Sequence, residues 1–132
     1  DNPNIIFHGK KNRLDMAKYY QASDFLVVSL IDRPIFSITV PAKIQTYIAA
    51  KKPILGFING DAAELIHDNN LGLCSGPSDI ANIAEIYLRC IEMNPAERES
   101  FTFKNDFLLQ EIFNKERTIN SLLEALITSN NN

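Results

Sequence analysis

A helix followed directly by a buried strand, within residues 37–59, constrains the fold more than any other feature of this sequence. Ile44, Tyr47 and Ile48 stand at helical spacing and form one apolar face. Pro53 ends that helix, because proline disfavours the α conformation of the residue before it. The five residues after Pro53 are an apolar run without alternation, which is typical of a strand covered on both faces. The stretch predicts half of an α/β unit, in which the loop before the helix is suited to bind an anion.

Three other short apolar runs alternate with helical patterns, which predicts a parallel sheet with right-handed crossovers. We expect a Rossmann-like three-layer α/β/α fold with a mainly four-stranded parallel sheet and extra C-terminal helices. Asp61 is predicted to cap the helix after the third strand, with Glu64 completing a capping-box-like pair. The predicted strands lie near residues 4–7, 25–30, 54–58 and 71–74, and the other predicted helices near 14–22, 78–93 and 95–127, the last with a kink around 101–105.

Composition excludes several classes of function. The chain has 132 residues and a net charge of −3, so it has no basic footprint for nucleic acid. No apolar run approaches the length of a membrane span, and the first residues do not resemble a signal sequence. Cys74 and Cys90 have no cysteine or histidine partners at metal-ligand spacing, so we expect free thiols in a reducing compartment and no metal site.

Ligands of open parallel sheets bind at the carboxyl ends of the strands, which locates the cleft in the sequence. The segment Ile35–Val40, between two prolines, is interpreted as a βα loop with apolar content. Its large apolar residues are expected to face a partner domain or a lipid-linked acceptor, or to pack beneath the loop as a small satellite core. The predicted strand ends are His8–Lys10, Ser29–Pro41, Asn59–Asp61 and Ser75–Gly76.

Several segments resemble family 4 glycosyltransferases in the expected order. Residues 41–54, PAKIQTYIAAKKPI, are similar to the "PsKxxeYmAaGkPil" segment of that family. Residues 4–9 resemble its "NVxFxG" strand, and residues 16–24, MAKYYQASD, resemble its "mxxyyxxaD" helix. Residues 25–30 are similar to its "llvsL" strand, and residues 59–72 to its "xxGdxxelI…xxG" segment. The resemblance covers roughly residues 4–90 and is closest to bacterial capsule and O-antigen transferases.

The resemblance implies a retaining enzyme with the two-domain GT-B architecture. Residues 1–132 are then expected to be a single domain, the truncated C-terminal half that binds the nucleotide sugar, and to be inactive without the acceptor-binding N-terminal half. The implied substrate is a nucleotide-diphosphate sugar of the UDP-linked type, with no cofactor and no metal. Implied partners are the N-terminal domain and a lipid-linked acceptor at the membrane surface, without nucleic acid. The implied location is the cytoplasm, or the inner face of the membrane.

The resemblance also implies which residues bind the donor, and physical chemistry supports part of that set. Free backbone N–H groups at a helix N-terminus bind anions, and Lys43 adds a positive charge there. Most of the family carries two glutamates that align with Thr46 and Ile38, and neither is acidic in this chain. A threonine hydroxyl still offers a ribose a hydrogen bond, weaker than that of a carboxylate. The predicted donor-binding residues are Gly9, Arg33, Pro41, Ala42, Lys43, Thr46, Asn59, Gly60 and Asp61; no catalytic residue is assigned.

Two other classes of protein are compatible with a fold of this type. A flavodoxin-like or receiver-like signalling domain shares the sheet, but a receiver needs an acidic cluster after the first strand, where this chain has His8-Gly9-Lys10-Lys11. A GT-B sugar epimerase needs histidines and acids that the sequence does not place. A titration with UDP and GDP tests the transferase hypothesis: no shifts of the Ala42, Lys43, Thr46 and Gly60 amides would remove it.

Overall fold

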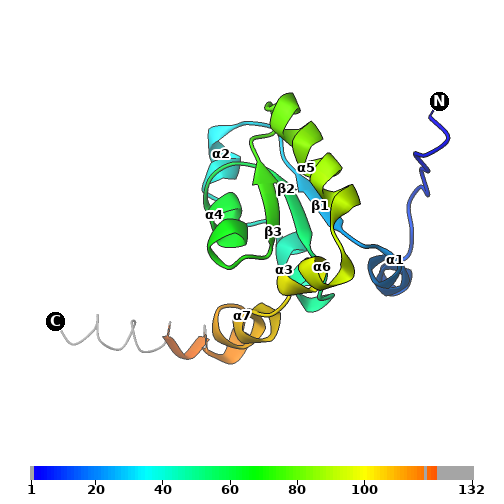
Figure 1. The fold of residues 1–132 in the computed structure, drawn as a ribbon. Helices are drawn as coiled ribbons and strands as arrows, with labels where there is room; N and C mark the ends of the chain where they lie inside the picture. Colours follow the sequence, from blue (N-terminus) through cyan, green and yellow to red (C-terminus); the bar gives the residue numbers. More distant parts are fainter. Residues whose placement is uncertain (1, 118, 122–132) are drawn as a thin grey trace.

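Three parallel strands form the sheet at the centre of the molecule (Figure 1), in a computed structural model that describes residues 2–117 and 119–121. The strands are β1 (Leu26–Ser29), β2 (Ile54–Phe57) and β3 (Gly72–Ser75), in the order β1-β2-β3. All four residues of β2 are buried, as predicted for a central strand covered on both faces. The three predicted strands in this part of the chain are thus confirmed, with small shifts at their ends.

Helices cover both faces of the sheet and its amino-terminal end (Figure 1). The short segment η1 leads into α1, and α5 is the longest helix in the described part of the chain. Side chains cap two of these helices: Asp79 accepts from the Asn82 amide at the start of α5, and Asn94 forms a full capping box with Glu97 at the start of α6. The bounds are η1 Arg13–Asp15, α1 Met16–Ala22, α2 Pro34–Ser37, α3 Ala42–Ala49, α4 Asp61–Asp68, α5 Ile80–Glu92, α6 Pro95–Ser100 and α7 Asn105–Glu111.

Two apolar cores lie on opposite faces of the sheet, which makes three layers. The larger core joins β1 and β2 to α3, α4 and α7, with Ile44, Ile48 and Leu108 fully buried. The smaller core joins β2 to α5 through Phe57, Ile86 and other side chains. Burial of large aliphatic side chains on this scale is the main force that holds the layers together.

The prediction of a fourth strand at residues 4–7 is wrong for this structure. The segment lies apart from the sheet beside α1 (Figure 1), and Ile5, Ile6 and Phe7 are 58%, 72% and 92% exposed. A strand needs a neighbouring edge for its backbone hydrogen bonds, and these residues pair with none of the described strands. Their β-forming composition alone does not make a strand.

Other differences concern the boundaries and faces of helices. Residues 34–37 form the short helix α2 where a loop was predicted. Gly60, and not Asp61, is the N-cap of α4: Gly60 has a non-helical φ of 72° and ψ of −149°, and the helix starts at Asp61, one residue earlier than predicted. The predicted helix over 95–127 is broken by turns at 101–104 and 112–114, and its part beyond 121 lies outside the described residues.

The apolar face predicted for the helix at 78–93 is only partly buried. Ile86 and Cys90 contact the sheet, whereas Ile80, Leu88 and Ile91 are 71%, 62% and 80% exposed. The helix carries apolar residues around much of its circumference, and a sheet of three strands covers only one side of it. Periodicity therefore identified the helix but not its buried face.

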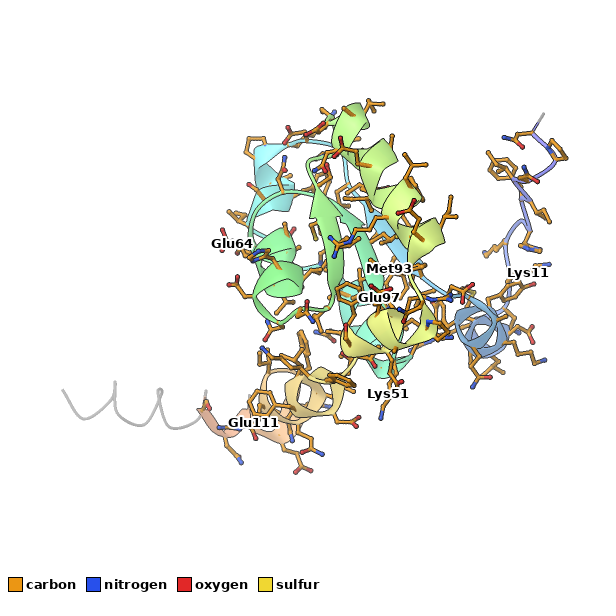
Figure 2. The ribbon with its side chains drawn as sticks, viewed as in Figure 1. Lys11, Lys51, Glu64, Met93, Glu97 and Glu111 are labelled. Atoms are coloured by element: carbon orange, nitrogen blue, oxygen red, sulfur yellow. The ribbon has the colours of Figure 1, made fainter. Side chains whose placement is uncertain are left out.

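The amino-terminal end of the sheet is closed by contacts between α3 and α7. Asn105 is 1% exposed, and its side-chain amide donates to the carbonyl of Ile48 near the end of α3, at 3.0 Å. Lys51, which Figure 2 shows at the end of the molecule where α6 and α7 lie, forms an exposed ion pair with Asp106. The two contacts leave the opposite, carboxyl-terminal end of the sheet as the open end.

Candidate functional site

A row of polar residues crosses the carboxyl ends of the three strands. Asn59, directly after β2, donates its side-chain amide to the carboxylate of Asp32, after β1, at 3.1 Å. On the other side, the side-chain oxygen Oδ1 of Asn59 lies 3.3 Å from the position that a Cβ on Gly76 would occupy. Asn82 at the start of α5 donates to the hydroxyl of the buried Ser75, at 3.1 Å. The site predicted from strand ends is thus a continuous polar edge.

An open hollow of about 400 Å³ lies next to this edge, between β3 and α4. Figure 2 shows Glu64 on α4, at the flank of the molecule where the hollow opens. Amide, hydroxyl, carboxylate and imidazole groups line it, a set suited to hydroxyl-rich ligands. The lining residues are Ile58, Asn59, Gly60, Ala63, Glu64, His67, Cys74, Ser75, Gly76 and Asn82.

The start of α3 lies toward the same end of the sheet. Because β1 and β2 are parallel, the connection through α3 runs back along the sheet, so its first residue is nearer the carboxyl ends. Pro41 is the N-cap, no side chain caps the helix, and the first ladder bond is that from the Ile44 amide to the Pro41 carbonyl. Ala42 and Lys43 are exposed, so their amides are available to an anion.

Thr46 and Gly9 lie elsewhere. The Thr46 hydroxyl donates back to the Ala42 carbonyl at 3.4 Å, and its side chain lines a groove of about 490 Å³ between α1 and α3. Gly9 belongs to the exposed N-terminal segment and has a φ of 66°. The structure therefore brings Asn59 and Gly60 to one hollow but places Thr46 and Gly9 apart from it.

Arg33 and Asp61 flank the polar edge. Arg33 precedes α2 and lines a very small hollow with Asp32, Asn59 and neighbouring apolar residues. Asp61 is exposed in the first turn of α4, where a carboxylate interacts favourably with the helix dipole. Its negative charge works against an anion at that helix end, which leaves the start of α3 as the more favourable place for a phosphate.

Sequence reasoning missed the contribution of α4 and α5 to the hollow. Glu64 was predicted to act in a capping box, and His67 was assigned no role in a site; the His67 side chain is 86% exposed but lines the rim. Asn82 was assigned no role, although its place one turn after the N-cap Asp79 was a signal that it reaches the end of β3.

Cys74 lines the hollow but is not suited to act as a nucleophile. Burial raises its pKa to about 11, and the thiol lies 4.0 Å from the Ala63 carbonyl. Cys90 is also a free thiol, and burial raises its pKa as well. Both free thiols were predicted, and a protonated thiol is a poor nucleophile.

Alkylation of Cys74 in the folded protein is expected to be slow near neutral pH and to keep rising up to about pH 11. Since the ordinary pKa of a cysteine thiol is near 9.0, a rise to about 11 lowers the thiolate population at pH 8 about a hundredfold. Iodoacetamide labelling followed by peptide mapping measures the rate at each pH, with the denatured chain as control. An alkylation rate of the folded protein that levels off near pH 9 would contradict the raised pKa of Cys74.

No helix in residues 2–117 and 119–121 is long and apolar enough to cross a membrane. Within the same residues, no group of three or more histidine, cysteine, aspartate or glutamate side chains is arranged to hold a metal ion. The expectation that no metal takes part remains a prediction.

The parallel three-stranded sheet with helices on both faces is compatible with a Rossmann-like fold, in which ligands bind at the carboxyl ends of the strands. The family model of the group 1 glycosyl transferases matches residues 1–93, more than half of the chain. The chain therefore belongs to the group 1 glycosyl transferases, and its domain is a glycosyltransferase domain. No curated protein and no solved structure matches it significantly.

Proposed function

We propose that this domain binds the nucleotide-sugar donor of a retaining glycosyltransferase, as the C-terminal half of a two-domain GT-B enzyme. The observation that carries the proposal is the exposed, uncapped start of α3 at the same end of the sheet as the polar edge, in a chain of the group 1 family. The two free amides and Lys43 suit a diphosphate, and the hydroxyl-rich sugar suits the neutral polar groups near Asn59 and Gly60.

The proposed pathway is surface polysaccharide biosynthesis of the capsule, O-antigen or exopolysaccharide type, with a UDP-linked hexose as donor. The exposed apolar residues Ile35, Ile38 and Val40 beside the site are 58%, 67% and 40% exposed, which fits a partner domain or a lipid-linked acceptor. The enzyme is then cytoplasmic, or peripheral at the inner face of the membrane. Catalysis relies on positioning and on stabilisation of the departing nucleotide diphosphate.

Titration of the ¹⁵N-labelled chain with UDP and with GDP is expected to shift the amide signals of Ala42, Lys43 and Gly60. Thr46 should respond less, because it lines a separate groove. The Arg98 amide donates to the Asn94 carbonyl in α6, at the opposite end of the sheet. Its signal is the internal reference and should not shift. Absence of shifts at all four site residues at millimolar ligand would remove the proposal and favour a non-enzymatic signalling domain.

The role of Lys43 is tested in the same titration. Lys43→Ala is expected to weaken UDP binding about two- to fivefold, since an exposed charge contributes roughly 0.5–1 kcal/mol. Lys104→Ala, which removes an exposed lysine just before α7, is the matched control and should leave UDP binding unchanged. Equal effects of the two substitutions would argue against a phosphate at the start of α3.

A further inference from the structure

The position of α2 at the mouth of the site is not maintained by burial of its own side chains. The helix spans only Pro34–Ser37 and has no buried residue. Ile35 points into solvent, and Phe36 and Ser37 are only half-buried. Since apolar burial contributes little there, other contacts must determine where α2 lies.

Two contacts from the turn after β2 supply that constraint. Gly60 packs so closely on α2 that any Cβ at that position would overlap the carbonyl of Ser37. Beside it, the Asn59 side-chain amide donates to the Asp32 carboxylate across 27 residues of sequence. The backbone contact fixes the end of α2, and the side-chain bond fixes its beginning.

We propose that Asn59 is a positioning residue, whose hydrogen bond to Asp32 holds α2 closed against the carboxyl edge of the sheet. This assigns Asn59 a role different from the direct donor contact expected from the sequence. The segment 32–41 leads from β1 to the start of α3, so the Asp32–Asn59 pair also determines where Arg33 and the amides of Ala42 and Lys43 lie. The link from this pair to nucleotide affinity rests on the proposed function; the link to α2 does not.

The experiment uses the Phe36 amide, whose hydrogen bond to the Arg33 carbonyl at 2.9 Å closes the turn of α2, so that its exchange reports how firmly this turn is held. In the protein without ligand, Asn59→Ala is expected to speed hydrogen exchange of this amide about fivefold. The factor corresponds to a loss of roughly 1 kcal/mol in the free energy of local opening. The Arg98 amide in α6 should exchange at an unchanged rate. An unchanged Phe36 rate in the Asn59→Ala variant would overturn the proposal.

Exchanging the two side chains of the Asp32–Asn59 pair, which gives a reversed pair, distinguishes a positioning role of Asn59 from direct contact with the ligand. In the double variant Asp32→Asn/Asn59→Asp, the amide and the carboxylate exchange places, so one donor and one acceptor still face each other. In the double variant, the exchange rate of the Phe36 amide should return to within about twofold of the parent rate. In Asn59→Asp alone, two carboxylates face each other, so the Phe36 amide should exchange faster than in the parent. A double variant that exchanges as fast as Asn59→Ala would show that the bond does not hold α2.

UDP binding is the second readout and distinguishes the two proposals. If Asn59 acts through α2, UDP affinity should fall about two- to fivefold in Asn59→Ala and recover in the reversed pair. If Asn59 contacts the ligand directly, affinity should stay low in the reversed pair even where Phe36 exchange recovers, and the positioning role in binding is then wrong. If the parent chain binds no UDP, the proposed function fails, while the Phe36 measurements still decide what holds α2.

Discussion

Replacement of Gly60 by alanine is expected to lower the free energy of unfolding by about 3 kcal/mol or more. Gly60 has a φ of 72° and a ψ of −149°, a conformation that is essentially restricted to glycine. The new Cβ would also overlap the backbone of Ser37, which has no flexible end that can move away. Both effects act at the junction of β2, α2 and α4, so we expect the loss in stability to be accompanied by a displaced α2.

Gly9→Ala is the matched control for this substitution. Gly9 has a similar φ of 66°, but a Cβ there would meet no atom within 4 Å. Its expected cost in unfolding free energy is about 1–2 kcal/mol, the strain of an alanine at positive φ alone. Urea unfolding followed by circular dichroism measures both variants. Comparable losses of unfolding free energy in the two variants would show that the close contact of Gly60 with Ser37 does not contribute to the cost of a Cβ at that position.

Leu108→Ala should destabilise the protein by about 2–5 kcal/mol, as other buried leucine truncations do. Leu108 on α7 is fully buried and joins the core formed by α3, α4 and the sheet. The variant would leave a cavity beneath the end of α3, near the Asn105 contact to Ile48. The effect tests whether α7 belongs to the folded domain or is only attached to it.

Phe107→Ala, one residue earlier in the same helix, provides the comparison. Phe107 is 60% exposed and lies outside the core, so its truncation should change stability by no more than about 0.5 kcal/mol. If the two variants unfold in urea with the same slope m, the difference between their midpoints gives the difference in unfolding free energy. Similar midpoints for the two variants would mean that α7 does not contribute to the core.

Features that depend on neighbouring residues were predictable from the sequence. The run after Pro53 became the central strand, because a segment so apolar is stable only when both of its faces are covered. The caps at Asp79 and Asn94 formed because their side chains reach amides three residues away, whatever the rest of the chain does. The family resemblance of the segment around residues 41–54 agrees with the match of the group 1 glycosyl transferases over residues 1–93.

Predictions failed where a partner distant in sequence had to be known. Ile5–Phe7 have the composition of a strand but no neighbouring edge, and the buried face of α5 depends on how many strands lie beneath it. Donor-site residues derived from the family resemblance were separated by the fold, since Thr46 faces α1 whereas Asn59 and Gly60 line the hollow at β3.

The amino-acid pattern was enough to predict the α/β class, the central strand and the end of the sheet where a ligand is expected. These follow from local preferences and hydrophobic spacing, which act over a few residues. Three features came from the packing of distant segments: the hydrogen bond from Asn59 to Asp32, the close contact of Gly60 with Ser37 and the burial that raises the pKa of Cys74. Each of these depends on contacts between segments far apart in the chain, whose distances and solvent exposure exist only once the layers have packed.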